Sequence, residues 1–443
     1  MLDIRVVRDD LDKVKRSLAK RGIEEAVLDE LWQTDQRARA ASTRRDELRA
    51  EINLISKEIA ELMRSGEKEL ASTLREKSRS VGEELSEWEL KAGNLEAERR
   101  DSLLKIPNMP SEDAPVGVSE ADNVVIRWWS PQVGPQNGSE IKLPEFADHQ
   151  KRPHWEIGSE LGILDLERAA KISGSMFPMF RGLGATLERA LSYFALDAHS
   201  DAFEEIKPPT FVRTATMIST GHLPKFEEDA YRLERDDLYA IPTAEVPLTS
   251  LAKDEILREE DLPVRLTAYT SCFRREAGSA GRDTRGLLRL HEFDKVEILA
   301  YTTPSQAAAM HSELLSRAEN LLQGLGLTYR VLDLCTADLG NSSKRTFDLE
   351  CYSPGTGLWL EVSSVSWFGD YQARRANIRF RSAETGQIEF IHTLNGSALA
   401  WARIWAVLVE TYRQSDGSVI IPEVLRRYMR DIDRIPSKQA SSA

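Results

Sequence analysis

The stretch from Leu28 to Leu104 limits the fold more than any other part of the chain, because it contains no proline and almost no strand-like alternation. Its one evident break is the segment Arg-Ser-Gly-Glu at 64–67. Apolar residues follow a heptad pattern on both sides of this break: Leu48, Ile52, Ile55, Ile59 and Leu62 before it, and Leu74, Val81, Leu85, Trp88 and Leu95 after it. The pattern predicts two long helices folded into an antiparallel hairpin, each ~54 Å long if ~36 residues are helical.

The first of these predicted helices carries a cluster of arginines, offset in the same stretch only by two acidic residues at 46 and 47: Arg37, Arg39, Arg44, Arg45 and Arg49. The whole chain has a formal net charge of −13, which argues against a protein that coats nucleic acid indiscriminately. A basic stripe on a protruding arm nevertheless suits a phosphate backbone. The periodicity alone leaves a second interpretation open, namely a dimerisation coiled coil.

The length of 443 residues is enough for two or three domains. Charged residues make up 30% of the chain, which indicates a soluble, helix-rich protein. The start MLDIRVVRDD has no apolar core of signal-peptide length. The most apolar late stretch, Leu394 to Val409, is interrupted by Asn395 and Arg403. We therefore expect a cytoplasmic protein that does not contact the membrane.

The chain contains only three cysteines, Cys272, Cys335 and Cys351. They form no close pair and have no His-rich neighbourhood, so we expect no zinc site. The simplest interpretation is that they are small core residues in a reducing compartment.

The stretch from Ala268 to Leu299 predicts a long β-hairpin, because two runs with strand-like alternation flank a flexible, basic loop. The loop contains three glycines and two arginines: Gly278, Gly281, Gly286, Arg282 and Arg285. A backbone of this kind, with cations beside it, suits the binding of phosphates.

Two pairs of side chains in this hairpin should each share one face of a strand. Arg274 and Glu276 do so on the outgoing run, and Phe293 and Glu297 on the returning run. Four residues of strand span ~13 Å, so that one end of the face can stack a purine while the other holds an ammonium or hydroxyl group. For each residue taken alone, a ribbon with surface ion pairs is the simpler interpretation.

The sequence CFRREAGSAGRDTRG, followed by RLHEFDKVE, resembles the second signature motif of class II aminoacyl-tRNA synthetases, in the form belonging to bacterial-type seryl-tRNA synthetases. Similar matches recur along nearly the whole chain. FEEIKPPTF, which includes Pro209, resembles the first class II motif, and NGSALAWARIWAVLVETY resembles the third. We expect the third motif to form a long amphipathic helix entered through a loop that contains glycine.

The resemblance implies an α+β fold with two domains. Residues 1–110 would form an N-terminal long antiparallel helical hairpin, a coiled coil that reaches the long variable arm of the serine tRNA. Residues 111–443 would form a class II catalytic domain built on an antiparallel β-sheet flanked by helices. The first motif forms the dimer interface in the family, so a homodimer is implied. After the helices end near Ile106, we expect a linker with exposed Trp128 and Trp129.

The activity implied by the resemblance is activation of serine by ATP, followed by transfer to a ribose hydroxyl at the 3′ end of tRNA. Both steps accumulate negative charge on oxygens, which fixed cations stabilise. The resemblance gives Arg274 the central role at the α-phosphate and serine carboxylate, and gives Arg403 the γ-phosphate. Phe293 would stack on adenine and Glu276 would accept from its amino group. Further ATP contacts are implied for Arg275, Leu290, Val362 and Ser363.

The strand that carries LEVSSVS would complete the catalytic site, with Glu361 as the third catalytic residue beside Arg274 and Arg403. Glu361 and Ser364 would also bind Mg²⁺, an ion that prefers oxygen ligands. Ideal alternation places these two side chains on opposite faces of the strand, so we expect that either a bulge or a contact through the backbone intervenes.

The resemblance implies a serine pocket formed by Thr243, Ala244, Glu245, Arg274, Glu297 and Ser397. A pocket of polar groups arranged for the substrate hydroxyl discriminates against alanine by about 10⁴ to 10⁵. Simpler interpretations are that Thr243 and Ser397 cap helices and that Glu297 pairs with Lys295 on the surface. Arg282 and Arg285 would contact tRNA together with the five arginines of the hairpin.

Two other functions stay open: a synthetase-like binding protein that has lost catalysis, and a ligase that charges a carrier-protein thiol. The chain also departs from the usual family pattern at four positions: Val365 replaces a cysteine, Ala398 and Ala402 replace glycines, and Trp401 replaces a small apolar residue. Glycine allows close approach of a ligand to the backbone. The departures predict either neutral repacking around a buried Trp401, or a specialised copy that binds inhibitors resembling seryl-adenylate poorly.

Overall fold

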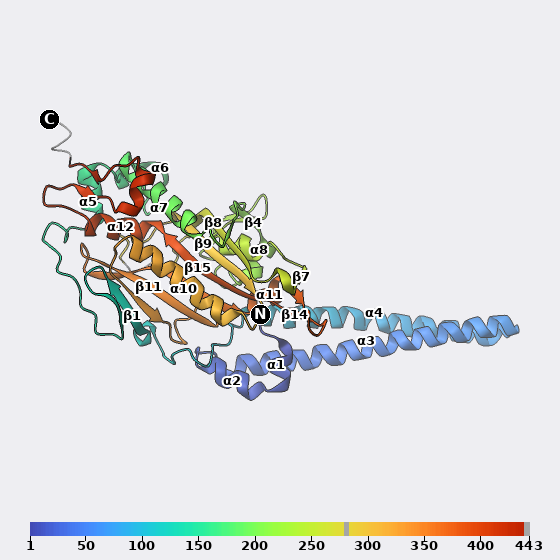
Figure 1. Ribbon diagram of the computed structural model, residues 1–443. Coiled ribbons are helices and arrows are strands. Elements are labelled where there is room, and N and C mark those ends of the chain that lie inside the picture. Colours follow the sequence, from blue (N-terminus) through green and yellow to red (C-terminus); the bar gives the residue numbers. More distant parts are fainter. Residues whose placement is uncertain (279–282, 438–443) are drawn as a thin grey trace. The chain divides into compact units, whose positions relative to one another are not determined.

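The computed structural model describes residues 1–278 and 283–437. The chain divides into two compact units, Leu2–Pro107 and a larger unit from Asn108 onward that also includes Met1 (Figure 1). Each unit has a hydrophobic core of its own. Among the helices of the described residues, none combines the length and the apolar character needed to cross a membrane.

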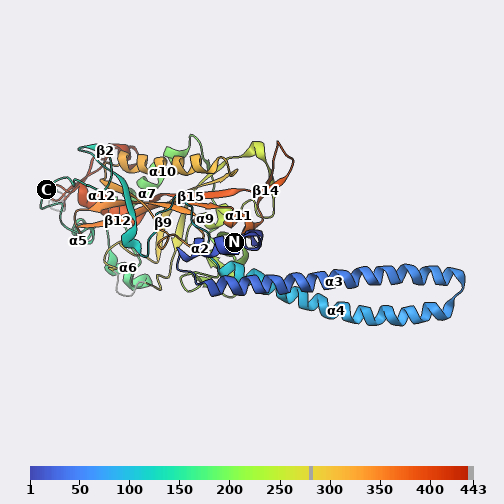
Figure 2. The same cartoon turned by 90° about the horizontal axis from the view of Figure 1, so that it is seen from below.

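The smaller unit contains two long helices preceded by two short ones, α1 (Ile4–Asp9) and α2 (Leu11–Ala19). Helix α3 (Glu25–Ser65) has 41 residues and α4 (Lys68–Lys105) has 38, so that each is ~60 Å long at 1.5 Å per residue. Figures 1 and 2 both show them side by side. Helix α3 ends at Gly66, whose left-handed backbone (φ 87°) favours glycine. The predicted helical hairpin is confirmed.

The buried seam between α3 and α4 follows the predicted heptads. Leu48, Ile55 and Val81 are buried in this seam, and partly buried residues pack against them: Ile52, Ile59, Leu74, Leu85 and Trp88. Asp35 of α3, which is 2% exposed, pairs with Arg8 of α1 and Arg99 of α4 at 2.7 and 3.0 Å. Apolar contacts and these ion pairs therefore hold the helices of this unit together.

The larger unit is built on a nine-stranded sheet among the described residues, with antiparallel neighbours except for the parallel pair β3–β8. In spatial order the strands are β2 (Gly134–Asn137), β1 (Val124–Ser130), β10 (Tyr329–Asp333), β11 (Arg345–Ser353), β12 (Leu358–Gly369), β15 (His392–Ala400), β9 (Glu292–Thr302), β8 (Val264–Phe273) and β3 (Glu204–Glu205). Short strands form three smaller sheets: β14 (Ile388–Phe390) with β13 (Arg379–Arg381) and β7 (Ile256–Arg258); β4 (Phe211–Arg213) with β6 (Leu238–Ala240) and β5 (Arg232–Leu233); and β16 (Val419–Ile420) with β17 (Arg434–Ile435).

Three helices pack on the large sheet: α7 (Leu183–His199), α10 (Ala307–Gly324) and α12 (Trp401–Thr411) (Figure 1). Their buried side chains form one core cluster with Val296, Ile298 and Ala300 of β9. Because alternate residues of a strand face opposite sides of the sheet, the odd-numbered residues of β9 point to the other face. The remaining helices are α5 (His154–Leu161), α6 (Leu166–Ser173), α8 (Thr214–Thr220), α9 (Glu245–Thr249), α11 (Tyr371–Ala376) and α13 (Glu423–Arg426).

The expectation that Trp128 and Trp129 are exposed in a linker is wrong. Both belong to β1, which pairs with β10 and β2. Trp128 is 4% exposed, and the ring of Trp129 stacks on Tyr329 with centroids 6.0 Å apart. Pairing with a strand two hundred residues later determines the place of this segment, and the linker interpretation overlooked the β-favouring run VVIRWW. The three cysteines are free and buried, as predicted.

The expectation that the third motif is a helix entered through a loop is also wrong for its first part. Residues up to Ala400 extend β15, and α12 begins only at Trp401. Strand β15 pairs with β12 on one side and with β9 on the other. Hydrogen bonding to both neighbours stabilises the strand and overrides the helical pattern of the local sequence.

Candidate active site

The hairpin of β8 and β9 forms one wall of an open pocket, called here the central pocket. The two strands pair from Val264–Tyr301 to Phe273–Glu292, which confirms the predicted hairpin. The pocket contains about 610 Å³ of empty space, including the solvent-filled region at its mouth. Four segments line it: Arg274 and Glu276; Leu287, Leu288, Arg289, Leu290, Phe293 and Lys295; Glu361, Val362 and Ser363; and Ser397, Ala400, Ala402 and Arg403.

Arg274 and Glu276 border the central pocket without belonging to a strand. Strand β8 ends at Phe273, and Glu276 has a positive φ of 51°, so the expected alternation does not continue to these residues. The guanidinium of Arg274 lies over the ring of Phe293, 5.3 Å from its centroid. Glu276 Oε2 accepts a hydrogen bond from Arg289 Nη1 at 2.7 Å. Contacts with the returning run therefore hold this segment in place of strand pairing.

Arg275 does not line the central pocket. Its guanidinium lies over the ring of Tyr231, 6.0 Å from the centroid, and its backbone N–H donates to Asp229 O at 2.9 Å. Two consecutive arginines therefore point to different surroundings once the strand has ended.

Arg403, at the start of α12, connects three segments of the pocket wall. Its Nη1 donates to the backbone oxygen of Glu361 at 2.7 Å and lies 3.4 Å from the Glu361 carboxylate. Its Nε donates to Leu288 O at 3.3 Å. The contacts with Glu361 and Leu288 thus fix the position of the guanidinium at the pocket wall.

A β-bulge in β12 brings Glu361 and Ser364 to the same face, as expected. Glu361 lies opposite Glu350 and Ser363 opposite Leu349, so that Val362 has no partner in the ladder. The strand then resumes its alternation beyond the bulge.

Glu361 and Ser364 line a second, acidic pocket together with Asp348 and Glu350 of β11. Ser364 lies directly opposite Asp348 in the ladder. Burial and the nearby Glu361 raise the pKa of Asp348 well above its ordinary value. Across residues 1–278 and 283–437, no three His, Cys, Asp or Glu side chains converge into a complete metal site.

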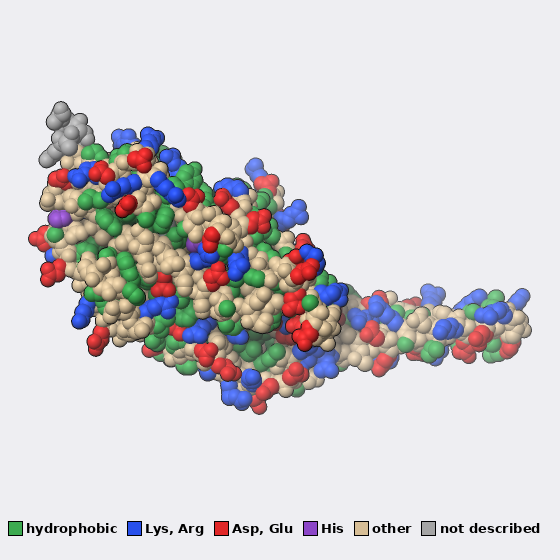
Figure 3. Space-filling model, viewed as in Figure 1, with side chains coloured by type: hydrophobic (Ala, Val, Ile, Leu, Met, Phe, Trp, Pro, Cys, Tyr) green, Lys and Arg blue, Asp and Glu red, His purple; other side chains and the backbone are tan. Residues whose placement is uncertain are grey.

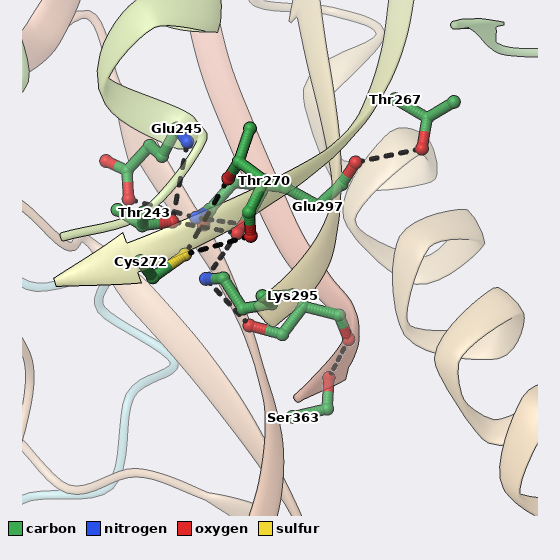
Figure 4. A network of polar contacts seen from close by, with 10 residues as sticks. Thr243, Glu245, Thr267, Thr270, Cys272, Lys295, Glu297 and Ser363 are labelled. Carbon is green, nitrogen blue, oxygen red and sulfur yellow. Dashed lines mark hydrogen bonds and ion pairs between the residues drawn. The ribbon is translucent and has the colours of Figure 1, made fainter. Parts of the chain in front are cut away.

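A buried polar network lies beyond Phe293 on the same face of β9 (Figure 4). Thr243 Oγ1 donates to Glu297 Oε2 at 2.9 Å. Asn395 Nδ2 donates to Glu297 Oε1 at 2.9 Å and to Glu245 Oε2 at 3.0 Å. Lys295 forms an ion pair with Glu297. The network brings together residues from three parts of the sequence that are more than fifty residues apart.

The structure excludes two of the simpler interpretations. Lys295 and Glu297 are 5% and 0% exposed, so their ion pair is buried and does not lie on the surface. Ser397 belongs to β15 and is not a helix cap; its Oγ accepts from Lys295 Nζ at 3.2 Å, and its backbone oxygen accepts from Ser363 Oγ at 2.5 Å. The N-cap of α9 is Ala244, and Thr243 Oγ1 makes only a long contact of 3.4 Å with the N–H of Glu245.

The carboxylates of Glu245 and Glu297 both accept from Asn395 Nδ2 in this network, and Lys295 pairs with Glu297. Burial and the neighbouring Glu297 raise the pKa of Glu245 to about 7. Glu245 Oε1 also accepts from Gln372 Nε2 at 2.6 Å, and Gln372 Oε1 accepts from Thr393 Oγ1 at 2.7 Å. Two neighbouring buried acids, of which only Glu297 forms an ion pair, favour a further ammonium or hydroxyl donor.

The sequence interpretation missed Lys295, Asn395 and Gln372. The signal for Lys295 was present, because the alternation that placed Phe293 and Glu297 on one face also places residue 295 there. Asn395 was not found because its motif was interpreted as a loop and helix. No signal in the sequence pointed to Gln372, whose position depends on the packing of α11.

A second buried network fixes the segment around Leu287, which follows the loop and lines the central pocket. Glu410 of α12 accepts from the backbone N–H of His154 and from its Nδ1, both at 2.9 Å. Leu287 N–H donates to His154 Nε2 at 2.9 Å, so the ring carries its proton on Nδ1. Gly286 has φ 61°, and a Cβ there would lie 2.3 Å from His154 Nε2. Only glycine therefore fits beside this histidine.

Arg285 pairs with Asp283 at 2.7 Å and lies over the ring of Trp155, 5.0 Å from the centroid. It is exposed on the loop. Arg282 and Gly281, which the sequence interpretation also placed in this loop, lie outside the described residues.

The arginines of α3 are not the free basic stripe that the sequence suggested. Four of them pair with carboxylates of α4: Arg37 with Glu98, Arg44 with Glu84, Arg45 with Glu96, and Arg49 with Glu89. Within the described part of the chain, Arg39 is the member of the cluster for which no such pair exists. Figure 3 accordingly shows basic and acidic side chains together along the hairpin. The carboxylates that offset these arginines belong to α4, whereas the sequence interpretation counted acidic residues within the first helix alone.

The four unusual positions are compatible with repacking. Trp401 is 1% exposed in the main core, and Val365 and Ala398 are also buried. Ala398 lies at a bulge between Ser397 and Leu399 in the pairing of β15 with β9. The described non-glycine residues with positive φ lie elsewhere, so neither alanine strains the backbone. Ala402 alone of the four lines the central pocket.

Comparisons with known proteins give matches over the whole chain. Residues 1–110 match the family model "Seryl-tRNA synthetase N-terminal domain", and residues 225–412 match "tRNA synthetase class II core domain (G, H, P, S and T)". The chain is 47% identical over 437 residues to a serine–tRNA ligase of Geobacillus kaustophilus, covering 98% of this chain and 100% of that protein. It is 44% identical over 437 residues to the serine–tRNA ligase of Listeria innocua, covering 98% and 99%.

Solved structures agree with these matches. The seryl-tRNA synthetase of Pyrococcus horikoshii, complexed with ATP, superposes with a TM-score of 0.89 at 35% identity and covers 99% of this chain and 100% of that one. The cytoplasmic serine–tRNA ligase of Naegleria fowleri, in complex with AMP, gives a TM-score of 0.80 at 27% identity, with 96% and 95% covered. None of these matches favours a binding protein without catalysis, a carrier-protein ligase or a specialised copy.

Proposed function

The chain belongs to the seryl-tRNA synthetase family, and from this premise we propose how its residues activate L-serine with ATP and transfer it to the 3′ end of tRNA(Ser). The observation that carries the proposal is the face of β9, where an aromatic ring, a lysine and a carboxylate follow at every second residue: Phe293, Lys295 and Glu297. A nucleotide base at one end and an amino acid at the other fit this order.

Arg274 is the central catalytic residue of the proposed activation step. The serine carboxylate attacks the α-phosphorus of ATP, and pyrophosphate leaves. Negative charge develops on the phosphate oxygens, which a fixed guanidinium stabilises. Arg274 borders the central pocket over Phe293, and Arg403 faces the same pocket from α12. Arg274 would bridge the α-phosphate and the carboxylate, while Arg403 would bind the γ-phosphate.

The remaining ATP contacts follow from the lining of the central pocket. Phe293 would stack on adenine, with Leu290, Val362 and Ser363 beside it. Glu276 would accept from the adenine amino group. Arg275 is directed to Tyr231, so we propose for it a supporting contact outside the pocket.

The residues of β12 suit Mg²⁺. Glu361 and Ser364 share a face through the bulge at Val362 and offer a carboxylate and a hydroxyl, the oxygen ligands that Mg²⁺ takes, usually together with substrate phosphates. The buried Oδ1 of Asp348, which has no hydrogen-bond partner among the described residues, lies opposite Ser364. When bound, the ion would neutralise charge on the phosphates. Glu361 is therefore proposed as both a catalytic residue and a metal ligand.

Serine specificity is proposed to reside in the buried network. Glu297 and Glu245 would accept from the ammonium and hydroxyl groups of serine, next to Thr243, Ala244 and Ser397. Alanine would leave these buried acceptors unpaired, which disfavours it strongly. Lys295 would balance the charge of Glu297 in this pocket.

We further propose that residues 1–110 bind tRNA and that residues 111–443 carry catalysis and dimerisation. The match of the first segment to the seryl-specific N-terminal domain supports this division. Exposure of Phe211, at 48%, and the edge position of β3 support a homodimer interface near the first motif. A cytoplasmic location is proposed with the same function.

Serine-dependent exchange of pyrophosphate into ATP tests the activation step. The purified protein is expected to catalyse exchange with serine and not with alanine, glycine or threonine, and Arg274→Ala is expected to abolish it. Glu297→Gln should raise KM for serine while KM for ATP stays nearly unchanged. If folded protein catalyses no exchange, the proposed function is wrong. Charging of tRNA(Ser) by the same preparation tests the second step, and gel filtration with light scattering tests the dimer.

A further inference from the structure

Gln372 of α11 is fully buried and does not line the central pocket, so the contacts proposed for ATP and serine leave it without a role. Its amide makes three hydrogen bonds to three different segments. Nε2 donates to Glu245 Oε1 at 2.6 Å and to the backbone oxygen of Thr220 at 3.2 Å. Oε1 accepts from Thr393 Oγ1 at 2.7 Å. One of these partners, Glu245, is an acid proposed to bind serine.

The three partners determine which way the amide of Gln372 points. An ionised carboxylate and a backbone carbonyl can only accept hydrogen bonds, so Glu245 and Thr220 both require the nitrogen of the amide. The hydroxyl of Thr393 donates to the amide oxygen on the other side. Turning the amide over would place oxygen against oxygen at two contacts. The hydrogen bonds therefore permit a single orientation of this side chain.

The backbone that carries Gln372 is anchored as well. Ala373 of the same helix is buried in a core cluster that includes Leu248 of α9. Arg375, one turn further along α11, donates from Nη1 to the backbone oxygen of Ile218 at 3.2 Å. The amide is thus presented to Glu245 from a helix that packs on both neighbouring helices, α8 and α9.

The carboxylate of Glu245 takes its direction from two neutral donors. Asn395 Nδ2 donates to Oε2 at 3.0 Å, and Gln372 donates to Oε1, so that each oxygen has one amide donor. The last torsion of a glutamate side chain has a broad energy minimum, and the two amides therefore decide in which plane the carboxylate lies. A carboxylate has about four acceptor positions, which leaves positions on both oxygens for a bound amino acid.

We propose that Gln372 is a positioning residue for the amino-acid substrate, which directs the carboxylate of Glu245 toward the ammonium and hydroxyl groups of serine. This proposal rests on the proposed function. Because the donor is a neutral amide, it orients Glu245 without adding a positive charge. A lysine or arginine at this position would compete with the ammonium group of serine for the same carboxylate.

The charges around Glu245 give Gln372 a second effect on the same step. Burial and Glu297 of β9 raise the pKa of Glu245 to about 7, whereas the hydrogen bond from Gln372 and the charges of Lys295 and Arg274 lower it. Loss of the amide donor should therefore raise this pKa further. At neutral pH a smaller fraction of the protein would then carry the charged acceptor for serine.

Gln372→Met tests the proposal, because methionine keeps the length of the side chain and removes its hydrogen bonds. We expect kcat/KM for serine in pyrophosphate exchange to fall about 10- to 150-fold, the effect of one hydrogen bond to a charged group, with KM for ATP near the parent value. In the parent, kcat/KM for serine should rise with pH as Glu245 ionises, and the variant's midpoint should lie at higher pH. The control Gln323→Met removes a hydrogen bond to Tyr329 Oη between α10 and β10 and should change neither quantity.

Thr393→Val separates positioning from packing, since it removes the donor that orients the amide and leaves Gln372 and Glu245 in place. We expect a smaller rise in KM for serine. The double variant should have the same KM for serine as Gln372→Met alone, because Thr393 acts through the amide.

Three results would overturn the proposal: a parent-like KM for serine in Gln372→Met, an equal rise of KM for ATP and for serine, or lower activity with an unmoved pH midpoint. If Gln372→Met does not fold, Thr393→Val decides, with an unchanged KM for serine as the contrary result. Absence of serine-dependent exchange in the parent protein would refute the proposed function itself.

Discussion

His154 is expected to control the shape of the proposed ATP site from a position outside the lining of the central pocket. Its ring links Glu410 of α12 to the N–H of Leu287. Leu287 and Leu288 line the central pocket, and Leu288 O accepts from Arg403. Removing the acceptor for Leu287 N–H should therefore shift both the pocket wall and Arg403, the arginine proposed to bind the γ-phosphate.

The magnitude follows from the two hydrogen bonds of the ring. The bond to the carboxylate is worth ~1.5–3 kcal/mol and the bond from Leu287 ~0.5–1.5 kcal/mol, so His154→Ala should lower the unfolding free energy by ~2–4.5 kcal/mol. The carboxylate of Glu410 keeps three other donors: the N–H of His154, Ser353 Oγ and the N–H of Gly355. The charge therefore stays partly paired, and the larger estimate for an orphaned buried ion does not apply.

Two conservative variants separate positioning from stability. His154→Asn retains a donor near the position of Nδ1 but loses the acceptor for Leu287, whereas His154→Gln retains an acceptor near the position of Nε2. We expect urea unfolding to show similar destabilisation of both. Pyrophosphate exchange should show KM for ATP raised about tenfold in His154→Asn and much less in His154→Gln, with KM for serine changed less in either. Equal KM for ATP in His154→Asn and the parent protein would refute the reasoning.

Three further predictions concern other parts of the molecule. Burial and the charge of Asp294 raise the pKa of Glu188 from 4.5 to about 8, so the contribution of this group to stability is complete below pH ~4.5 and is lost as pH rises toward 8. A shift of this size corresponds to roughly 4–5 kcal/mol between these pH values, and Glu188→Gln should remove that pH dependence from the free energy of unfolding measured in urea. The double variant that combines Arg44→Glu with Glu84→Arg should unfold at a higher free energy than Arg44→Glu alone, because the ion pair between the two helices is restored. If the double variant binds tRNA with the same salt dependence as the parent protein, Arg44 contacts no phosphate. Trp401→Phe should change the unfolding free energy by less than ~1 kcal/mol, because the indole N–H has no hydrogen-bond partner among the described residues, whereas Trp401→Ala should lower it by ~3–5 kcal/mol; a changed KM for ATP in Trp401→Phe would contradict repacking.

Local patterns in the sequence predicted the long elements well. The seam of α3 and α4 was predictable because heptads record which side of each helix is buried, and Gly66 marks the turn. The β8–β9 hairpin was predictable because its strands are adjacent in sequence and flank a glycine-containing loop. In both cases the partners are joined directly, so a pattern within one stretch contains most of the pairing information.

The features of the site that the sequence did not predict depend on partners far away along the chain. Asn395 lies in a strand because β9 and β12 pair on both sides of it, and helix-like periodicity in its own motif cannot reveal this. The neutralisation of Arg44 depends on Glu84, which is forty residues away. The pKa of Glu245 depends on burial beside Glu297. Such features arise from tertiary packing, and only the folded chain brings their members together.

Strand β15 passes into α12 without a loop, since Ala400 ends the strand and Trp401 begins the helix. Ser397, next to the acids proposed to bind serine, and Arg403, proposed to bind the γ-phosphate, are thereby joined by a single rigid junction. Insertion or deletion of one residue there would turn Arg403 by about 100° around the helix axis while Ser397 stayed in its ladder. This junction therefore tolerates exchange of side chains, as at Ala398 and Trp401, but no change in length, and gene variants with a codon gained or lost here should be inactive.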